Sequence, residues 1–191
     1  MMKSFPVDVS AGACIAGCLL ILLTPLELTA SLFLAAIIHE AGHILSFLLF
    51  RVPILGLTFR IGGAMIQTAP IAAKEELICA AAGPLASLIC ALFLQRFPLL
   101  GICALIQGVF NLLPLYPMDG GRILRCFCIL FCLNHTVFIC KAAAISSIAI
   151  IFTIFLALFL HTRDPLYLVI AFYFLIQTCQ NINTPCKEHE Y

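Results

Sequence analysis

Long runs without a charged residue constrain this chain more than any other feature of its sequence. A helix needs about 20 apolar residues to cross a hydrocarbon layer roughly 30 Å thick, because it rises about 1.5 Å per residue. The chain is 63% hydrophobic and only 10% charged, which leaves too little polar surface for a soluble domain. The runs therefore predict a polytopic membrane protein.

The predicted fold is an all-α membrane protein with about six spanning helices. They are expected at 9–26, 28–50, 77–95, 97–118, 142–162 and 165–180, in one membrane core over residues 1–180 with a short tail at 181–191. The stretch 126–140 is expected to hold the end of the fourth span and a turn. No persuasive cleavage site follows the first apolar run, so we read it as a retained helix.

A small membrane-associated β-hairpin is expected between the second and third spans. Leu57 to Ile61 alternates apolar and polar residues, Gly62-Gly63 offers a turn, and 64–68 can return as a second strand. An ordinary connecting loop is the alternative. An exposed edge of such a hairpin could pair with an extended peptide by strand addition.

Basic residues predict which way the chain crosses the membrane. With a cytoplasmic N-terminus, six spans place most of the Lys and Arg residues on the inner side and only Arg96 and Arg163 outside. The inner residues are Lys3, Arg51, Arg60, Lys74, Arg122, Arg125, Lys141 and Lys187. We therefore expect both termini in the cytoplasm.

Other classes of function receive little support. The 11 cysteines are scattered without paired C-x-x-C spacing and read as small buried hydrophobic residues. The net charge is +1, and no basic patch with interleaved aromatic residues suggests nucleic acid.

The segment His39-Glu40-Ala41-Gly42-His43 lies inside the second apolar run. Ionisable groups within a membrane segment are costly, so they indicate a functional site by default. Residues four apart lie on one face of a helix, so both imidazoles can bind one metal ion, and H-E-x-x-H is the spacing of catalytic zinc sites. Glu40 can then serve as a general base. Histidines that only pack between helices are the structural alternative.

A catalytic zinc usually has three protein ligands, so a third must come from elsewhere. The candidate is Asp119, which follows a segment broken by Pro114 and Pro117 after Asn111. Regular helices would place Asn111 about 21 Å and His43 about 22 Å below the outer boundary. Asp119 could instead cap a helix, with Arg122 as its counter-charge. Asn111 could cap the broken helix end or donate a hydrogen bond to an oxyanion.

With both motifs stated, the chain resembles the site-2 protease family of intramembrane zinc metalloproteases, especially the branch that includes the stage IV sporulation protein FB. His39 to His43 resembles the family's zinc-binding helix, and 111–120 resembles its N-x-x-P-x-x-P-x-D-G segment. The resemblance implies one zinc ion per chain on His39, His43 and Asp119. It implies Glu40 as the general base and Asn111 as an oxyanion partner.

The chain departs from the family pattern in two respects. Many members have Asn in a G-P-x-x-N motif, whereas Gly83-Pro84-Leu85-Ala86-Ser87 ends in Ser. We assign Gly83 and Pro84 to helix packing. The 11 residues from Asn181 to Tyr191 are too few for the CBS or PDZ domains of other members, so regulation by those domains is not expected.

The resemblance implies a zinc metalloendopeptidase of a bacterial cytoplasmic membrane. Its substrate would be a membrane-tethered regulator, such as a precursor sigma factor or an anti-sigma factor, and an inhibitory or regulatory membrane partner is compatible with this role. The alternative is a membrane metal-binding or ion-transport protein that uses the same histidines and aspartate. A haem-binding bundle is disfavoured, because His135, His161 and His189 fall near the ends of the runs.

Overall fold

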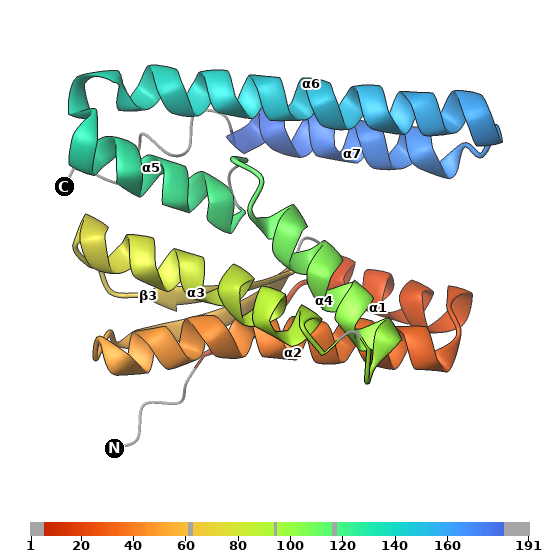
Figure 1. Ribbon diagram of the computed structural model, residues 1–191, viewed down its shortest axis with the longest axis horizontal. Coiled ribbons are helices and arrows are strands. Elements are labelled where there is room, and N and C mark those ends of the chain that lie inside the picture. Colours follow the sequence, from red (N-terminus) through yellow and green to blue (C-terminus); the bar gives the residue numbers. More distant parts are fainter. Residues whose placement is uncertain (1–5, 61–62, 94, 116–117, 182–191) are drawn as a thin grey trace. The chain divides into compact units, whose positions relative to one another are not determined.

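The computed structural model of the chain describes residues 6–60, 63–93, 95–115 and 118–181. The chain divides into two compact units, residues 1–110 and 111–191. Figure 1 follows the elements along the chain by colour. Those of the first unit are β1 (Val7–Val9), α1 (Ala11–Leu23), α2 (Leu26–Leu49), β2 (Ile54–Arg60), β3 (Gly63–Thr68), α3 (Ala73–Ala91) and α4 (Pro98–Asn111), whose last residue begins the second unit.

The helices of the first unit pack through small side chains. Ala35 of α2 is fully buried against Cys103 and Ala104 of α4. Gly42 of α2 lies so close to α3 that an added Cβ would come within 2.6 Å of the Ala82 carbonyl oxygen. Small residues let helix backbones approach one another in this way. The approach brings the middle of α2 against α3.

A three-stranded sheet follows α2 in the first unit, with strand order β1-β2-β3. The predicted hairpin is confirmed: β2 and β3 pair antiparallel, with Leu57 opposite Ile66. The predicted turn lies partly outside the described residues, because residue 62 does. The strand β1 was not predicted, and it pairs parallel with β2 in the segment where the first span was expected to begin.

The second unit contains α5 (Asp119–Phe131), a short 3₁₀ helix (Leu133–His135), α6 (Thr136–Thr162) and α7 (Leu166–Asn181). Figure 1 shows α6 and α7 lying alongside each other. A buried cluster of Leu115, Ala144 and Ile151 packs the segment before α5 against α6. The expected turn within 126–140 is present, but residues 126–131 belong to α5, which is a helix separate from α4.

Each predicted span contains a helix, although the bounds differ. Among the described residues, α2 and the segment Leu133–Thr162 are long and apolar enough to cross a membrane, by length and composition. Ala11–Leu23, Pro98–Asn111 and Leu166–Ile176 are apolar but shorter. The six-span arrangement therefore stays a prediction. The expected tail after residue 181 lies outside the described residues.

Candidate metal centre

The two histidines of the H-E-x-x-H segment lie one turn apart on the same face of α2. Their side chains are buried, with 3% of His39 and 5% of His43 exposed. The Nε2 atoms of the two rings are 3.3 Å apart, and the rings meet edge to face with their centroids 5.0 Å apart. The sequence therefore predicted correctly that both imidazoles share one face.

The spacing of the two nitrogens fits a zinc ion. Zinc binds imidazole nitrogen at about 2.0–2.1 Å, and tetrahedral ligands at that radius lie about 3.3–3.4 Å from one another. The 3.3 Å between the Nε2 atoms matches that edge. A hydrogen bond from one imidazole to the other would span a similar distance. The two Nε2 atoms thus have the separation of two ligands of a tetrahedral metal ion.

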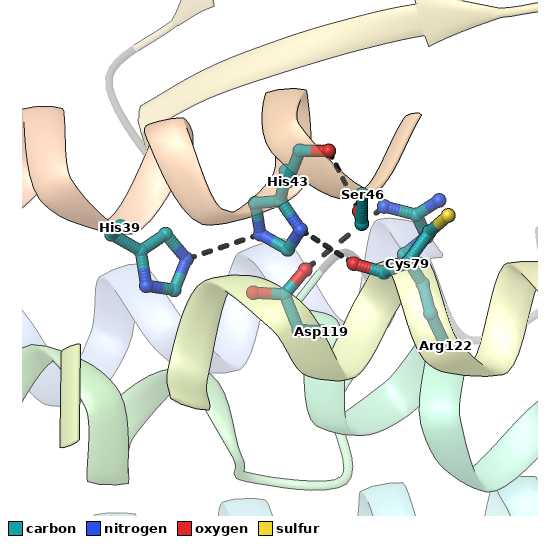
Figure 2. Close-up of polar contacts among 6 residues, drawn as sticks. All are labelled: His39, His43, Ser46, Cys79, Asp119 and Arg122. Atoms are coloured by element: carbon teal, nitrogen blue, oxygen red, sulfur yellow. Dashed lines mark hydrogen bonds and ion pairs between the residues drawn. The ribbon is translucent and has the colours of Figure 1, made fainter. Parts of the chain in front are cut away.

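A backbone carbonyl of α3 holds the ring of His43. The Nδ1 atom of His43 lies 2.8 Å from the carbonyl oxygen of Cys79, a contact drawn in Figure 2. A carbonyl oxygen can only accept a hydrogen bond, so Nδ1 carries the proton and donates it. The lone pair of Nε2 is therefore available for a metal, and such outer partners are typical of metal-binding histidines.

The ring of His39 also has a partner on α3, but this partner is a side chain. Its Nδ1 atom lies 3.0 Å from Oγ of Ser87, and Ser87 has no exposed surface. Sequence reasoning noted Ser87 only as a departure from a family motif. It missed this contact.

Gly83 makes room for the ring of His43. A Cβ atom added at Gly83 would overlap the imidazole at Nε2, Cε1 and Cδ2. Any side chain at this position would therefore displace the ring from its place. The earlier assignment of Gly83 to helix packing is thus incomplete, because the packing partner is a candidate metal ligand.

The residues of α3 that contact the two rings repeat at a spacing of four. Cys79, Gly83 and Ser87 lie on one stripe of the helix, because residues at i, i+4 and i+8 share a face. Cys79 and Gly83 serve His43, and Ser87 serves His39, so α3 runs antiparallel to α2. This stripe of small residues was visible in the sequence and could have indicated the contact.

Asp119 is the first residue of α5, and its side chain is buried, with 7% of the residue exposed. The N-cap of α5 is Met118, so Asp119 does not cap the helix as the structural alternative expected. Its Oδ1 atom lies 3.9 Å from Nη1 of Arg122 (Figure 2). A negative carboxylate in the first turn is favoured by the helix dipole.

The backbone before α5 folds tightly against its first turn. The amide of Leu115 donates to the carbonyl of Leu113 at 2.7 Å, and that of Met118 donates to Leu115 at 2.8 Å. A side chain at Gly120 would overlap the carbonyls of Leu112 and Leu113. Residues 112–115 and Met118 thus pack against the first turn of α5, and residues 116 and 117 lie outside the described residues.

His39 and His43 of the first unit and Asp119 of the second unit are each buried, and all three are residue types that bind metal ions. Glu40 is half-buried on α2 beside His39. Asn111 is the last residue of α4 and is also half-buried. The catalytic roles of Glu40 and Asn111 stay predictions.

The chain is similar to a zinc metalloprotease and to a solved site-2 protease structure. No protein-family profile matches the chain. A zinc metalloprotease of Methanocaldococcus jannaschii is 34% identical over 108 residues, which cover 49% of this chain and 32% of that protein. The chain thus matches about a third of that relative's length.

A solved structure, the site-2 protease from Methanocaldococcus jannaschii, superimposes with a TM-score of 0.68 at 22% identity. The match covers 96% of this chain and 93% of that one. The chain therefore has the fold of a site-2 protease. The resemblance to the sporulation branch stays a prediction.

Proposed function

We propose that this chain is an intramembrane zinc metalloprotease of the site-2 protease family. One observation carries the proposal: two buried imidazoles on a long apolar helix hold their Nε2 atoms 3.3 Å apart, at the separation of tetrahedral zinc ligands. The similarity to a zinc metalloprotease and the fold of a site-2 protease support it.

His39, His43 and Asp119 would hold the metal in the proposed enzyme. Two neutral imidazoles and one carboxylate are a ligand set that zinc accepts, and three protein ligands leave a fourth position open. When bound, zinc polarises a carbonyl group and acidifies water at neutral pH.

Glu40 and Asn111 would handle protons and charge in the reaction. Glu40 lies next to His39 on α2, where its carboxylate can take a proton from the attacking water and return it to the leaving amine. Asn111 would donate a hydrogen bond to the oxyanion that develops on the scissile carbonyl. Neither residue is fully buried.

The edge of the sheet offers a means of handling the substrate. A membrane helix hides its carbonyls in internal hydrogen bonds, so it must unwind before water can attack. The strand order leaves β3 at one edge of the sheet, and an extended peptide could pair with that edge. The proposed substrates are membrane-tethered regulatory proteins, and the proposed location is a bacterial cytoplasmic membrane with both termini inside.

The test combines zinc quantification with cleavage of a co-expressed membrane-tethered substrate. Glu40→Gln keeps a similar size and removes the base, so we expect one zinc per chain and no detectable cleavage. Asp119→Ala should lower both zinc occupancy and cleavage, because a ligand is lost. Cleavage by Glu40→Gln at the wild-type rate would refute the assigned base.

A transporter would give a different pattern in the same membranes. It would move zinc across vesicles that contain the purified chain and would cleave no substrate. Metal flux without proteolysis would therefore contradict the proposed function in favour of the ion-transport alternative.

A further inference from the structure

The two candidate zinc ligands on α2 are held by partners of different chemistry. His43 donates to the Cys79 carbonyl, a backbone group that every residue possesses. His39 contacts the hydroxyl of Ser87, a side-chain group that a single substitution removes. The orientation of His39 thus depends on the identity of one residue.

We infer that Ser87 is a positioning residue that orients His39 for metal binding. This inference rests on the proposed function, because it assumes that Nε2 of His39 binds the metal. With Nε2 as the ligand atom, the ring proton lies on Nδ1, and Ser87 Oγ accepts it at 3.0 Å. Ser87 would thereby fix both the tautomer and the rotation of the ring.

The helix α4 fixes the place of Ser87. Gly108 of α4 faces Ser87, and a Cβ added at Gly108 would come within 3.1 Å of the Ser87 Cβ and 3.3 Å of the Leu88 side chain. Gly108 is buried, so these atoms have little room to move. The positioning thus runs from α4 through Ser87 to His39.

Loss of the hydroxyl should weaken metal binding without removing a ligand. Ser87→Ala leaves the Nδ1 proton of His39 buried without that acceptor, which favours rotation of the ring or the other tautomer. Removal of an orienting partner typically lowers metal affinity about 10- to 100-fold. We expect a loss in this range.

The experiment measures the zinc affinity of the full chain in detergent by competition with a chelating indicator. Ser87→Thr retains a hydroxyl and should stay much closer to wild type than Ser87→Ala. The matched control is Ser46→Ala on α2, because Ser46 is buried and its hydroxyl donates to the His43 backbone carbonyl at 2.7 Å, not to a ring. Visible absorption of the cobalt-substituted chain, which reports coordination geometry, should change for Ser87→Ala and not for Ser46→Ala.

The outcomes separate this inference from the proposed function. Wild-type chain that binds no stoichiometric zinc would refute the proposed function. Zinc-binding wild type with equal affinity in Ser87→Ala would refute only the role of Ser87, as would equal losses in Ser87→Ala and Ser87→Thr.

Gly108→Ala gives a second route if Ser87→Ala does not fold. The added methyl group would lie 3.1 Å from the Ser87 Cβ, its nearest neighbour, so Ser87 must shift by a few tenths of an ångström while its hydroxyl remains. A measurable loss of zinc affinity, smaller than the loss of about 10- to 100-fold expected for a missing hydroxyl, supports the inference. Unchanged affinity together with an unchanged cobalt spectrum contradicts it.

Discussion

The helices α2 and α6 are both long and apolar enough to span a membrane, yet they differ in what they carry at their centres. The middle of α2 holds His39, Glu40 and His43, whereas residues 142–160 of α6 include no ionisable side chain. The buried residues of α6 are Ala144, Ser147 and Ile151. Similar length therefore does not imply a similar role.

The difference between the two helices teaches how polar groups are accommodated inside an apolar helix. An isolated ionisable side chain at membrane depth costs several kcal/mol. On α2, both imidazoles are buried against α3, and each ring receives a hydrogen-bond partner from Cys79 or Ser87. The helix α3 thus supplies the hydrogen-bond partners that the imidazoles of α2 need. The centre of α6 carries no ionisable side chain and needs no such partners.

The largest expected effect on zinc binding comes from filling the space that Gly83 of α3 leaves for the His43 ring of α2. Gly83→Ala places a methyl group where the His43 ring lies, so the ring must leave its position. We expect zinc affinity to fall by more than about 100-fold, beyond the loss typical of an altered orienting partner, and cleavage to be lost with it. Zinc competition titrations measure the effect.

Gly17→Ala on α1 is the matched control, because nothing lies within 4 Å of a Cβ added at Gly17. It should bind zinc normally and gain about 0.5–1 kcal/mol of helix stability. Wild-type zinc affinity in Gly83→Ala would show that the packing of α3 against α2 does not determine the position of His43 as a metal ligand.

A second prediction introduces a charge into α6. Ile150 is 61% exposed near the middle of this helix, where a bilayer would surround it. Ile150→Arg should raise the free energy of membrane insertion by about 3–4 kcal/mol, with a smaller change for Ile150→Ala. A translocon-based insertion assay of α6 measures both. Equal insertion of the arginine variant would argue against α6 as a spanning helix.

A third prediction distinguishes the helices by metal removal. A ligand at 100 times its dissociation constant stabilises the folded state by about 2.7 kcal/mol, so a chelator should lower the midpoint of thermal unfolding. Amide hydrogen exchange should rise in α2 and α3 and stay unchanged in α7. His39→Ala should respond to chelator much less than wild type. An equal response of both proteins would place the stabilising metal elsewhere.

Local patterns predicted the elements that depend on nearby residues. The i and i+4 spacing of His39 and His43 placed both rings on one face, and alternation with a glycine turn predicted the hairpin of β2 and β3. Pro114 and its neighbours predicted the break after Asn111, which the structure places between α4 and α5.

The features that the sequence did not reveal depend on distant partners. The strand β1 has three residues and pairs with β2 some 50 positions later (Val7 with Leu57), so no local signal specifies it. The Ser87 contact joins residues 48 positions apart and requires knowledge of which face of α3 meets α2. Two motifs could be recognised separately, but their mutual geometry is a property of tertiary packing.

The use of a main-chain oxygen at Cys79 has a consequence for how homologous sequences can diverge. Because any amino acid supplies that oxygen, position 79 is free to drift among side chains small enough to fit, and the support of His43 is inherited with the backbone. Position 87 lacks this freedom, since only residues bearing a hydrogen-bonding group can replace serine there. Substitution at position 87 can therefore alter the support of His39, whereas the carbonyl that supports His43 does not depend on which side chain stands at position 79.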